Sequence, residues 1–184
     1  MDFSVDGLTL VALVPSRTRT LLHGFDVDSG ALASTLELPE EWSAVRAVND
    51  GYIVWRGARV MCVNTKGAQV WSIAPVEEAT YLTSVCVSGD GAHVVTSGSG
   101  EVARLWNGHT GQLVHTLREE SGDVCTAAVS ADGAYTATAT LKGIVRVWRN
   151  DSGVELASRK STRCCRSRSP STAKACSAGT ATVT

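Results

Sequence analysis

An internal repeat between residues 81 and 148 constrains the fold of this chain more than any other feature. Residues 88–91 (Ser-Gly-Asp-Gly) recur as 130–133 (Ser-Ala-Asp-Gly), and residues 104–106 (Arg-Leu-Trp) recur as 146–148 (Arg-Val-Trp). Equivalent residues therefore lie 42 positions apart. A fixed period of this length, with short apolar runs between the marks, is typical of one supersecondary unit used several times. The repeat predicts a scaffold built from such units.

Two marks trace the unit back to the start of the chain. The first is an Asp-Gly pair between apolar runs, which favours a hairpin because glycine accepts positive φ and the short aspartate bonds nearby backbone. It occurs at Asp6-Gly7, Asp50-Gly51, Asp90-Gly91 and Asp132-Gly133. The second is a large or buried-type residue five positions before the glycine of a polar turn. It occurs as Phe25 with Gly30, Cys62 with Gly67, Trp106 with Gly111, and Trp148 with Gly153. The two marks alternate in strict order, which indicates four units.

The runs between these turns are short and rich in branched and apolar residues, as expected for strands. Helical periodicity is not sustained anywhere for ten or more residues. We therefore predict an all-β body in which each unit is a four-stranded antiparallel meander. The units are expected at 1–38, 39–74, 75–117 and 118–158, and the first lacks most of its first strand because few residues precede its turn. Trp106 and Trp148 are expected to be buried packing residues, whereas Trp42, Trp55 and Trp71 lie outside the shared marks and are candidate surface anchors.

The composition changes abruptly at residue 159. Residues 1–155 carry 11 Lys and Arg against 18 Asp and Glu, whereas residues 156–184 carry 6 Lys and Arg and no acid. The segment 159–184 has almost no large apolar residues, so we expect a disordered basic tail. Its Arg-Ser-Arg-Ser-Pro run at 166–170 suggests an RNA-binding or acidic-partner arm, or a phosphorylated segment. The alternative is that a shifted reading frame or alternative terminus begins near residue 158.

No residue set points to catalysis, a cofactor or a metal. The four histidines, His23, His93, His109 and His115, have no metal-ligand or acid–base spacing, and glycine-rich phosphate loops are missing. Single cysteines within apolar runs behave as small buried residues, which fits a reducing compartment. Residues 8–14 are interpreted as a strand and not an export signal, because acidic residues precede them. We expect an intracellular, cytoplasmic, non-enzymatic protein without a membrane span.

The third and fourth units resemble the WD-repeat β-propeller family. The resemblance rests on residues 84–91 with 104–106, and on residues 126–133 with 143–148, and it is most specific over 75–157. It implies that each unit is a four-stranded blade arranged around a central channel. It also implies a scaffold that binds other proteins at its rims, which is an inference from fold analogy.

Two departures from the family pattern shape our expectations. The family's usual Gly-His pair is replaced by Glu77-Glu78 and Glu119-Glu120, and Lys142 stands where the family's structural Asp would precede the last Arg-Val-Trp strand. The resemblance then implies that the buried His-to-Asp network of such blades is missing. Four units also fall short of the six to eight of family propellers, so we expect a partial propeller. Its uncovered ends favour self-association.

The acidic pairs are the candidate interaction residues. Glu77, Glu78, Glu119 and Glu120 would fall at one rim of a propeller and attract a basic peptide or a cation through their summed potential. The alternative is that they are solvated connector residues. The functional hypotheses are a non-enzymatic protein-interaction scaffold, a nucleic-acid-associated factor using the basic tail, and a non-functional or truncated fragment of a larger WD-repeat protein.

Overall fold

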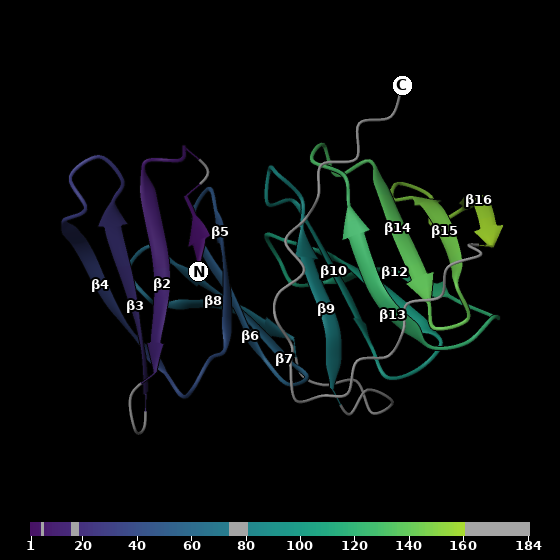
Figure 1. Cartoon of the computed structure of the whole chain (residues 1–184), viewed down its shortest axis with the longest axis horizontal. Coiled ribbons are helices and arrows are strands. Elements are labelled where there is room, and N and C mark those ends of the chain that lie inside the picture. Colours follow the sequence, from purple (N-terminus) through teal and green to yellow (C-terminus); the bar gives the residue numbers. More distant parts are fainter. Residues whose placement is uncertain (5, 16–18, 74–80, 161–184) are drawn as a thin grey trace.

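The described part of the chain is built from strands alone. The computed structural model describes residues 1–4, 6–15, 19–73 and 81–160, which contain 16 strands and no helix. The strands form four antiparallel four-stranded sheets (Figure 1). The predicted all-β class and the four meanders are therefore confirmed. Glu77, Glu78 and the tail from residue 161 onward lie outside the described residues.

Each sheet is a simple meander in which consecutive strands pair. The first sheet holds β1 (Asp2–Phe3), β2 (Thr9–Pro15), β3 (Arg19–Asp26) and β4 (Leu32–Pro39). The second holds β5 (Ala44–Val48), β6 (Gly51–Arg56), β7 (Arg59–Asn64) and β8 (Gln69–Ile73). The short β1 agrees with the expectation that the first unit lacks most of its first strand.

The third and fourth sheets are the closest copies of each other. The third holds β9 (Leu82–Val87), β10 (His93–Gly98), β11 (Val102–Asn107) and β12 (Leu113–Arg118). The fourth holds β13 (Val124–Val129), β14 (Tyr135–Thr140), β15 (Ile144–Arg149) and β16 (Glu155–Lys160). The last strand extends past the predicted boundary, because Arg159 and Lys160 pair with Val145 and Ile144 of β15.

The core lies between sheets. One cluster joins the first and second sheets through Val11, Leu22 and Val54, and another joins the second and third through Ile53, Trp71 and Trp106. Two smaller clusters join the third and fourth sheets. In Figure 1 the four sheets stand side by side in chain order, with the first and fourth at opposite ends of the long axis. Among the described residues, one face of each end sheet is therefore not covered by another sheet.

Period-two alternation explains why these segments are strands. In β14, Thr136, Thr138 and Thr140 are buried while the two residues between them are half-buried. Successive side chains of a strand point to opposite faces, so one face of β14 looks into the sheet interface and the other does not. The described residues include no helix with the length and apolar character needed to cross a membrane.

Candidate interaction surfaces

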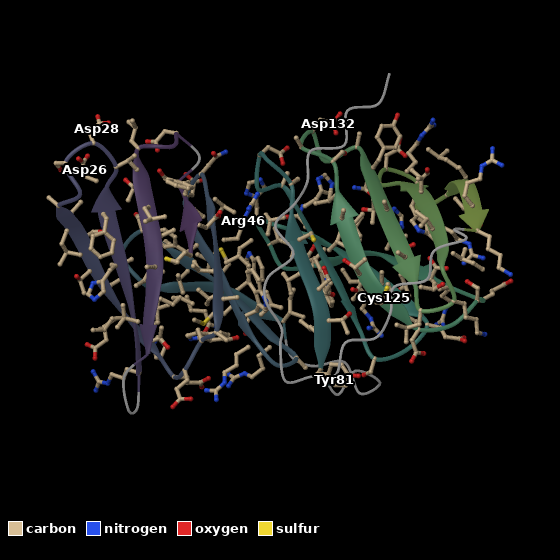
Figure 2. The ribbon with its side chains drawn as sticks, viewed as in Figure 1. Asp26, Asp28, Arg46, Tyr81, Cys125 and Asp132 are labelled. Atoms are coloured by element: carbon tan, nitrogen blue, oxygen red, sulfur yellow. The ribbon has the colours of Figure 1, made fainter. Side chains whose placement is uncertain are left out.

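The meander places two kinds of turn on one rim. The turn between the first and second strands of a sheet and the turn between the third and fourth strands lie at the same end, because neighbouring strands run antiparallel. The turns of both repeat marks therefore lie on this rim. Figure 2 shows Asp26, Asp28 and Asp132 there, whereas Tyr81 lies at the opposite rim. We call the first the aspartate rim and the second the connector rim.

The Asp-Gly turns of three sheets share one hydrogen-bond pattern. In the fourth sheet, the Ser130 hydroxyl donates to Asp132 Oδ1 at 2.6 Å, and the Ala134 amide donates to the same oxygen at 3.0 Å. Ser88 and Asp90 repeat this arrangement in the third sheet. These bonds, led by the one from serine, lower the pKa of each aspartate carboxyl. The carboxylates are therefore held in the charged form and in a fixed position.

The first sheet keeps this pattern and the second does not. Ser4 donates to Asp6 Oδ1 at 2.5 Å, which lowers the pKa of Asp6 in the same way. In the second sheet Val48 stands at the serine position, and Val48 pairs directly with Gly51 in a two-residue hairpin. Asp50 is exposed at this turn. Its carboxylate adds charge to the rim without the turn bonds seen in the other three sheets.

The turns of the second mark also lie on the aspartate rim. Asp26 Oδ1 accepts hydrogen bonds from the Ser29 hydroxyl at 2.5 Å and the Ser29 amide at 2.8 Å, which lower its pKa. Asp28 and Asp151 are exposed in equivalent turns. The rim thus gathers seven carboxylates, against Lys66 and Arg149. They are Asp6, Asp26, Asp28, Asp50, Asp90, Asp132 and Asp151.

A hollow opens on the aspartate rim beside the fourth sheet. It has a volume of about 450 Å³, and its lining includes His93 and Tyr135 together with the turn residues Asp132 and Asp151. Arg149 also contributes to the wall. Aromatic and carboxylate groups side by side can hold a cationic side chain.

The connector rim has mixed charge, and its described glutamates are largely engaged. Glu40 forms an ion pair with Arg59, and Glu41 forms one with Arg56. A hollow of about 440 Å³ beside Trp42 is lined by these residues. The Arg59 guanidinium also lies 5.8 Å from the centre of the Trp42 ring. These carboxylates are largely neutralised by arginines of the same chain.

Glu119 does not lie on the surface as the rim hypothesis required. Its side chain is fully buried, and it accepts hydrogen bonds from the Thr138 hydroxyl and from Arg146 Nη1. Its neighbour Glu120 is exposed on the connector rim. Of the four predicted rim glutamates, the described part of the chain therefore presents Glu120 alone to a partner.

Glu119 instead completes a buried polar network in the fourth sheet. Trp148 Nε1 donates to Thr138 Oγ1 at 2.9 Å, and Thr138 donates onward to Glu119. Arg146 also pairs with Glu155, with Nε and Oε2 at 3.0 Å. The resemblance implied that this copy lacks the family's buried His-to-Asp network. A glutamate–arginine pair anchors a different buried network in this sheet.

The tryptophans are placed differently from one another. Trp106 and Trp148 are buried, and Trp106 Nε1 donates to Thr96 Oγ1 at 2.8 Å. Trp42 and Trp71 are also buried, so they do not serve as surface anchors. Trp55 is half-buried. The sequence did not indicate that Trp71 is buried, because its partner is distant: its Nε1 donates to the Gly108 carbonyl of the next sheet at 2.9 Å.

Two of the four glycines that end the second repeat mark have a common role. Gly111 and Gly153 adopt φ of +69° and +67°, and each lies directly beneath a side chain of the preceding sheet. Trp71 covers Gly111, and His115 covers Gly153. A glycine is needed at both places because the left-handed conformation and the close approach leave no room for a side chain.

The described residues form no metal site, and one of their cysteines is a buried thiol. Within residues 1–4, 6–15, 19–73 and 81–160, no cluster of three or more His, Cys, Asp or Glu side chains could hold a metal ion. Cys62 and Cys86 are free thiols, and burial raises the pKa of the Cys62 thiol to about 11. A thiol of this kind stays protonated at neutral pH and is a poor nucleophile.

Comparison with known families supports the fold assignment. Residues 111–149 match the family model described as WD domain, G-beta repeat. The match runs from the last strand of the third sheet through the third strand of the fourth, so the sequence repeat and the structural sheet are offset by one strand. No curated protein sequence gives a significant match to the chain.

Proposed function

We propose that this chain, which carries a WD40 repeat at 111–149 and four sheets consistent with a partial WD-repeat propeller, is a non-enzymatic scaffold that binds a basic segment of a partner protein at its aspartate rim. The WD40 repeat supports a protein-interaction scaffold in general. The choice of rim and of partner chemistry rests on the charges of this chain.

The observation that carries the proposal is the clustering of seven aspartates on one rim. Four of them, Asp6, Asp26, Asp90 and Asp132, have lowered pKa values caused first by hydrogen bonds from neighbouring serines. Charged groups that are already held in place need little reorganisation on binding. Their summed potential attracts a cationic partner and speeds its association.

The same charge argues against a polyanionic partner on this rim. Nucleic acids bind through lysine and arginine contacts to phosphates, and aspartates repel phosphates. The connector rim is less suited to capture a cation, because Glu40 and Glu41 already pair with Arg59 and Arg56. The hollow beside Asp132 and Asp151 offers a place for one lysine or arginine side chain of the partner.

The test uses carboxylates that add charge without supporting a turn. The triple variant Asp28→Asn/Asp50→Asn/Asp151→Asn removes three exposed charges from the aspartate rim. Binding of a fluorescent lysine-rich peptide to the full chain is followed by anisotropy at low and at high salt. We expect binding that weakens with salt and that the triple variant weakens at least tenfold, which is about 1.4 kcal/mol.

A matched variant removes the same charge from the other rim. Glu101→Gln/Glu120→Gln/Asp123→Asn changes three exposed carboxylates at or near the connector rim. This variant should bind the peptide as the unaltered chain does. If both variants weaken binding equally, net charge and not the aspartate rim controls it. If the unaltered chain does not bind the peptide, a basic partner is excluded.

A further inference from the structure

The second-to-third and third-to-fourth sheet contacts share a recurring feature. The third-to-fourth-strand turn of one sheet holds a positive-φ glycine, and a side chain from the outermost strand of the preceding sheet lies on it. A Cβ added at Gly111 would come within 2.9 Å of the Trp71 ring, and one at Gly153 would come within 2.9 Å of the His115 ring.

The first-to-second-strand turns show the same relationship. A Cβ at Gly91 would lie 3.2 Å from Val48 of the preceding sheet, and one at Gly133 would lie 2.5 Å from His93. In each case the turn glycine of the later sheet is covered by a side chain from the earlier sheet. The aspartate-rim edges of the second-to-third and third-to-fourth contacts are built in this way. Between the first and second sheets the neighbours are looser, since a Cβ at Gly67 would lie 3.8 Å from the Glu37 carbonyl oxygen and 4.0 Å from the Leu36 side chain.

The first sheet presents the same glycines without a cover. Gly7 and Gly30 have φ of +74° and +67°, close to the values at the covered glycines, yet an added Cβ would meet no atom within 4 Å at either position. The turns therefore have the conformation of a docked sheet. The described part of the chain places no sheet over them.

The fourth sheet shows the complementary situation. Ala103 and Leu105 of the third sheet are fully buried in clusters with residues of the fourth. Their equivalents 42 positions later are Val145, which is 38% exposed, and Val147, which is half-buried. Tyr135 is the equivalent of His93, the residue that covers Gly133, and it is 43% exposed. The side chains that would pack against a following sheet are therefore present, but they are exposed or half-buried.

The two uncovered faces are complementary in the size of their side chains. Strand pairing places Phe3, Leu10, Phe25 and Leu32 in one row across the first sheet, and Phe3 and Leu32 are each 55% exposed. The fourth sheet presents a face of small residues. Its rows contain Ala128 with Ala137 and Val147, and Ala139 with Val145. Large groups on one face can therefore fill the space above small groups on the other.

We propose that two copies of this chain join head to tail, with the uncovered face of the fourth sheet in each copy packed against the uncovered face of the first sheet in the other. Each contact continues the series of internal sheet contacts, with Tyr135 of one copy over Gly7 of its partner. A two-fold axis relates the two identical contacts, and four sheets from each copy close one ring.

Closure favours the pair over an open chain. Once the first contact forms, the second joins groups that are already held near each other, so it forms at a high effective concentration. An unclosed head-to-tail series would instead grow without limit. The proposal therefore requires a species of two copies and no larger one.

The first test is the mass of the full chain in solution. Size-exclusion chromatography with light scattering should give twice 19.3 kDa over the micromolar range, with dissociation on dilution. A chain that stays at 19.3 kDa at the highest concentrations would overturn the proposal. Growth beyond two copies would overturn the closed ring.

Variants on the two faces decide the geometry. Val145→Glu and Phe3→Glu should each shift the full chain to the single-copy mass, because each places a charge in both contacts of the ring. Val70→Glu, at a residue that is 54% exposed on β8 of the second sheet, is the matched control and should leave the pair intact. Retained thermal transitions would show that the three variants are folded.

Mixing the two face variants separates head-to-tail pairing from pairing of like faces. A pair made from one Val145→Glu copy and one Phe3→Glu copy keeps one unaltered contact, so the mixture should form heterodimers more strongly than either variant forms homodimers. If two fourth sheets packed on each other instead, Phe3→Glu would have no effect and the mixture would not recover. Either of those results would rule out the proposed arrangement.

Discussion

Glu119 and Arg146 form an ion pair inside the fourth sheet, where the glutamate side chain is fully buried and the arginine is 14% exposed. The glutamate also accepts a hydrogen bond from Thr138, which in turn accepts one from Trp148. A buried pair of this kind adds less stability than its Coulomb attraction suggests, because both ions lose water. Removal of one partner is costly, however, since it leaves the other charge buried and unpaired.

Glu119→Gln should therefore destabilise the chain strongly. We expect a loss of about 3 kcal/mol in the free energy of unfolding, at the lower end of the range for a broken buried pair, because Glu155 still pairs with Arg146. Urea denaturation followed by tryptophan fluorescence measures it. The adjacent and exposed Glu120→Gln is the control and should change stability by less than about 0.5 kcal/mol. Equal effects at both positions would contradict the buried network.

Trp148 should stabilise the fold mainly through packing of its ring, and its indole hydrogen bond should contribute less to the free energy of unfolding. Trp148→Ala removes a buried side chain and should cost about 3–5 kcal/mol. Trp148→Phe keeps much of the apolar volume but loses the donor to Thr138, so it should cost clearly less. Comparison of the two by chemical denaturation separates packing from hydrogen bonding. If the phenylalanine variant were as unstable as the alanine variant, the hydrogen bond would outweigh the packing.

Sequence reasoning recovered the strands and turns because their signals are local. An Asp-Gly pair and a polar turn with glycine each reverse the direction of the chain within a few residues. Four meanders could therefore be counted from the sequence. Glu119 was misjudged because its neighbour is also a glutamate and such a pair suggests a solvated connector. Its burial depends on Thr138 and Arg146, 19 and 27 positions away.

Trp42 is a second residue whose burial the sequence did not predict. It lies outside every repeat mark, so its position in the sequence suggested a surface residue. In the structure its amide donates to the Thr20 hydroxyl at 2.8 Å, and its ring nitrogen donates to the Pro39 carbonyl at 2.8 Å. Residues of the first sheet thus draw it into the boundary between the first and second sheets. Only the tertiary contacts reveal this.

Trp42→Ala should consequently be a severe substitution. We expect a cost of about 3–5 kcal/mol, similar to that at Trp148, because both rings are buried and join two sheets. Thermal unfolding of the two alanine variants under the same conditions compares them. A cost below about 1 kcal/mol at Trp42 would indicate an exposed ring and would contradict this packing.

The hydrogen-bonded aspartates should make the free energy of unfolding depend on pH in the acidic range. The pKa of Asp132 is lowered in the folded chain, first by the Ser130 hydroxyl and then by the Ala134 amide. A group with a lowered folded pKa stabilises the fold above its unfolded pKa, and that stabilisation is lost as the pH falls through the folded pKa. Stability should thus decline as the pH drops below about 4.

Asp132→Asn isolates this contribution. The variant should lose part of the decline in stability below the ordinary aspartate pKa of 3.8, measured as the urea midpoint at a series of pH values. Asp28→Asn, at an exposed residue in another turn of the same rim, should retain the full decline. An unchanged pH dependence in Asp132→Asn would show that the turn carboxylate does not contribute.

Gly111 and Gly30 allow the contact between sheets to be separated from backbone strain. Both have similar positive φ, so alanine at either position should cost about 1–2 kcal/mol for the left-handed conformation. At Gly111 the new Cβ would also lie 2.9 Å from the Trp71 ring, whereas at Gly30 it would meet open space within the chain. Overpacking of this kind adds about 1–3 kcal/mol. Gly111→Ala should therefore unfold at a lower urea concentration than Gly30→Ala when both are measured on the single-copy chain. Because the strain is common to both variants, a difference between them reports the cover that one sheet provides for the turn of the next, and equal midpoints would mean that this cover adds no stability.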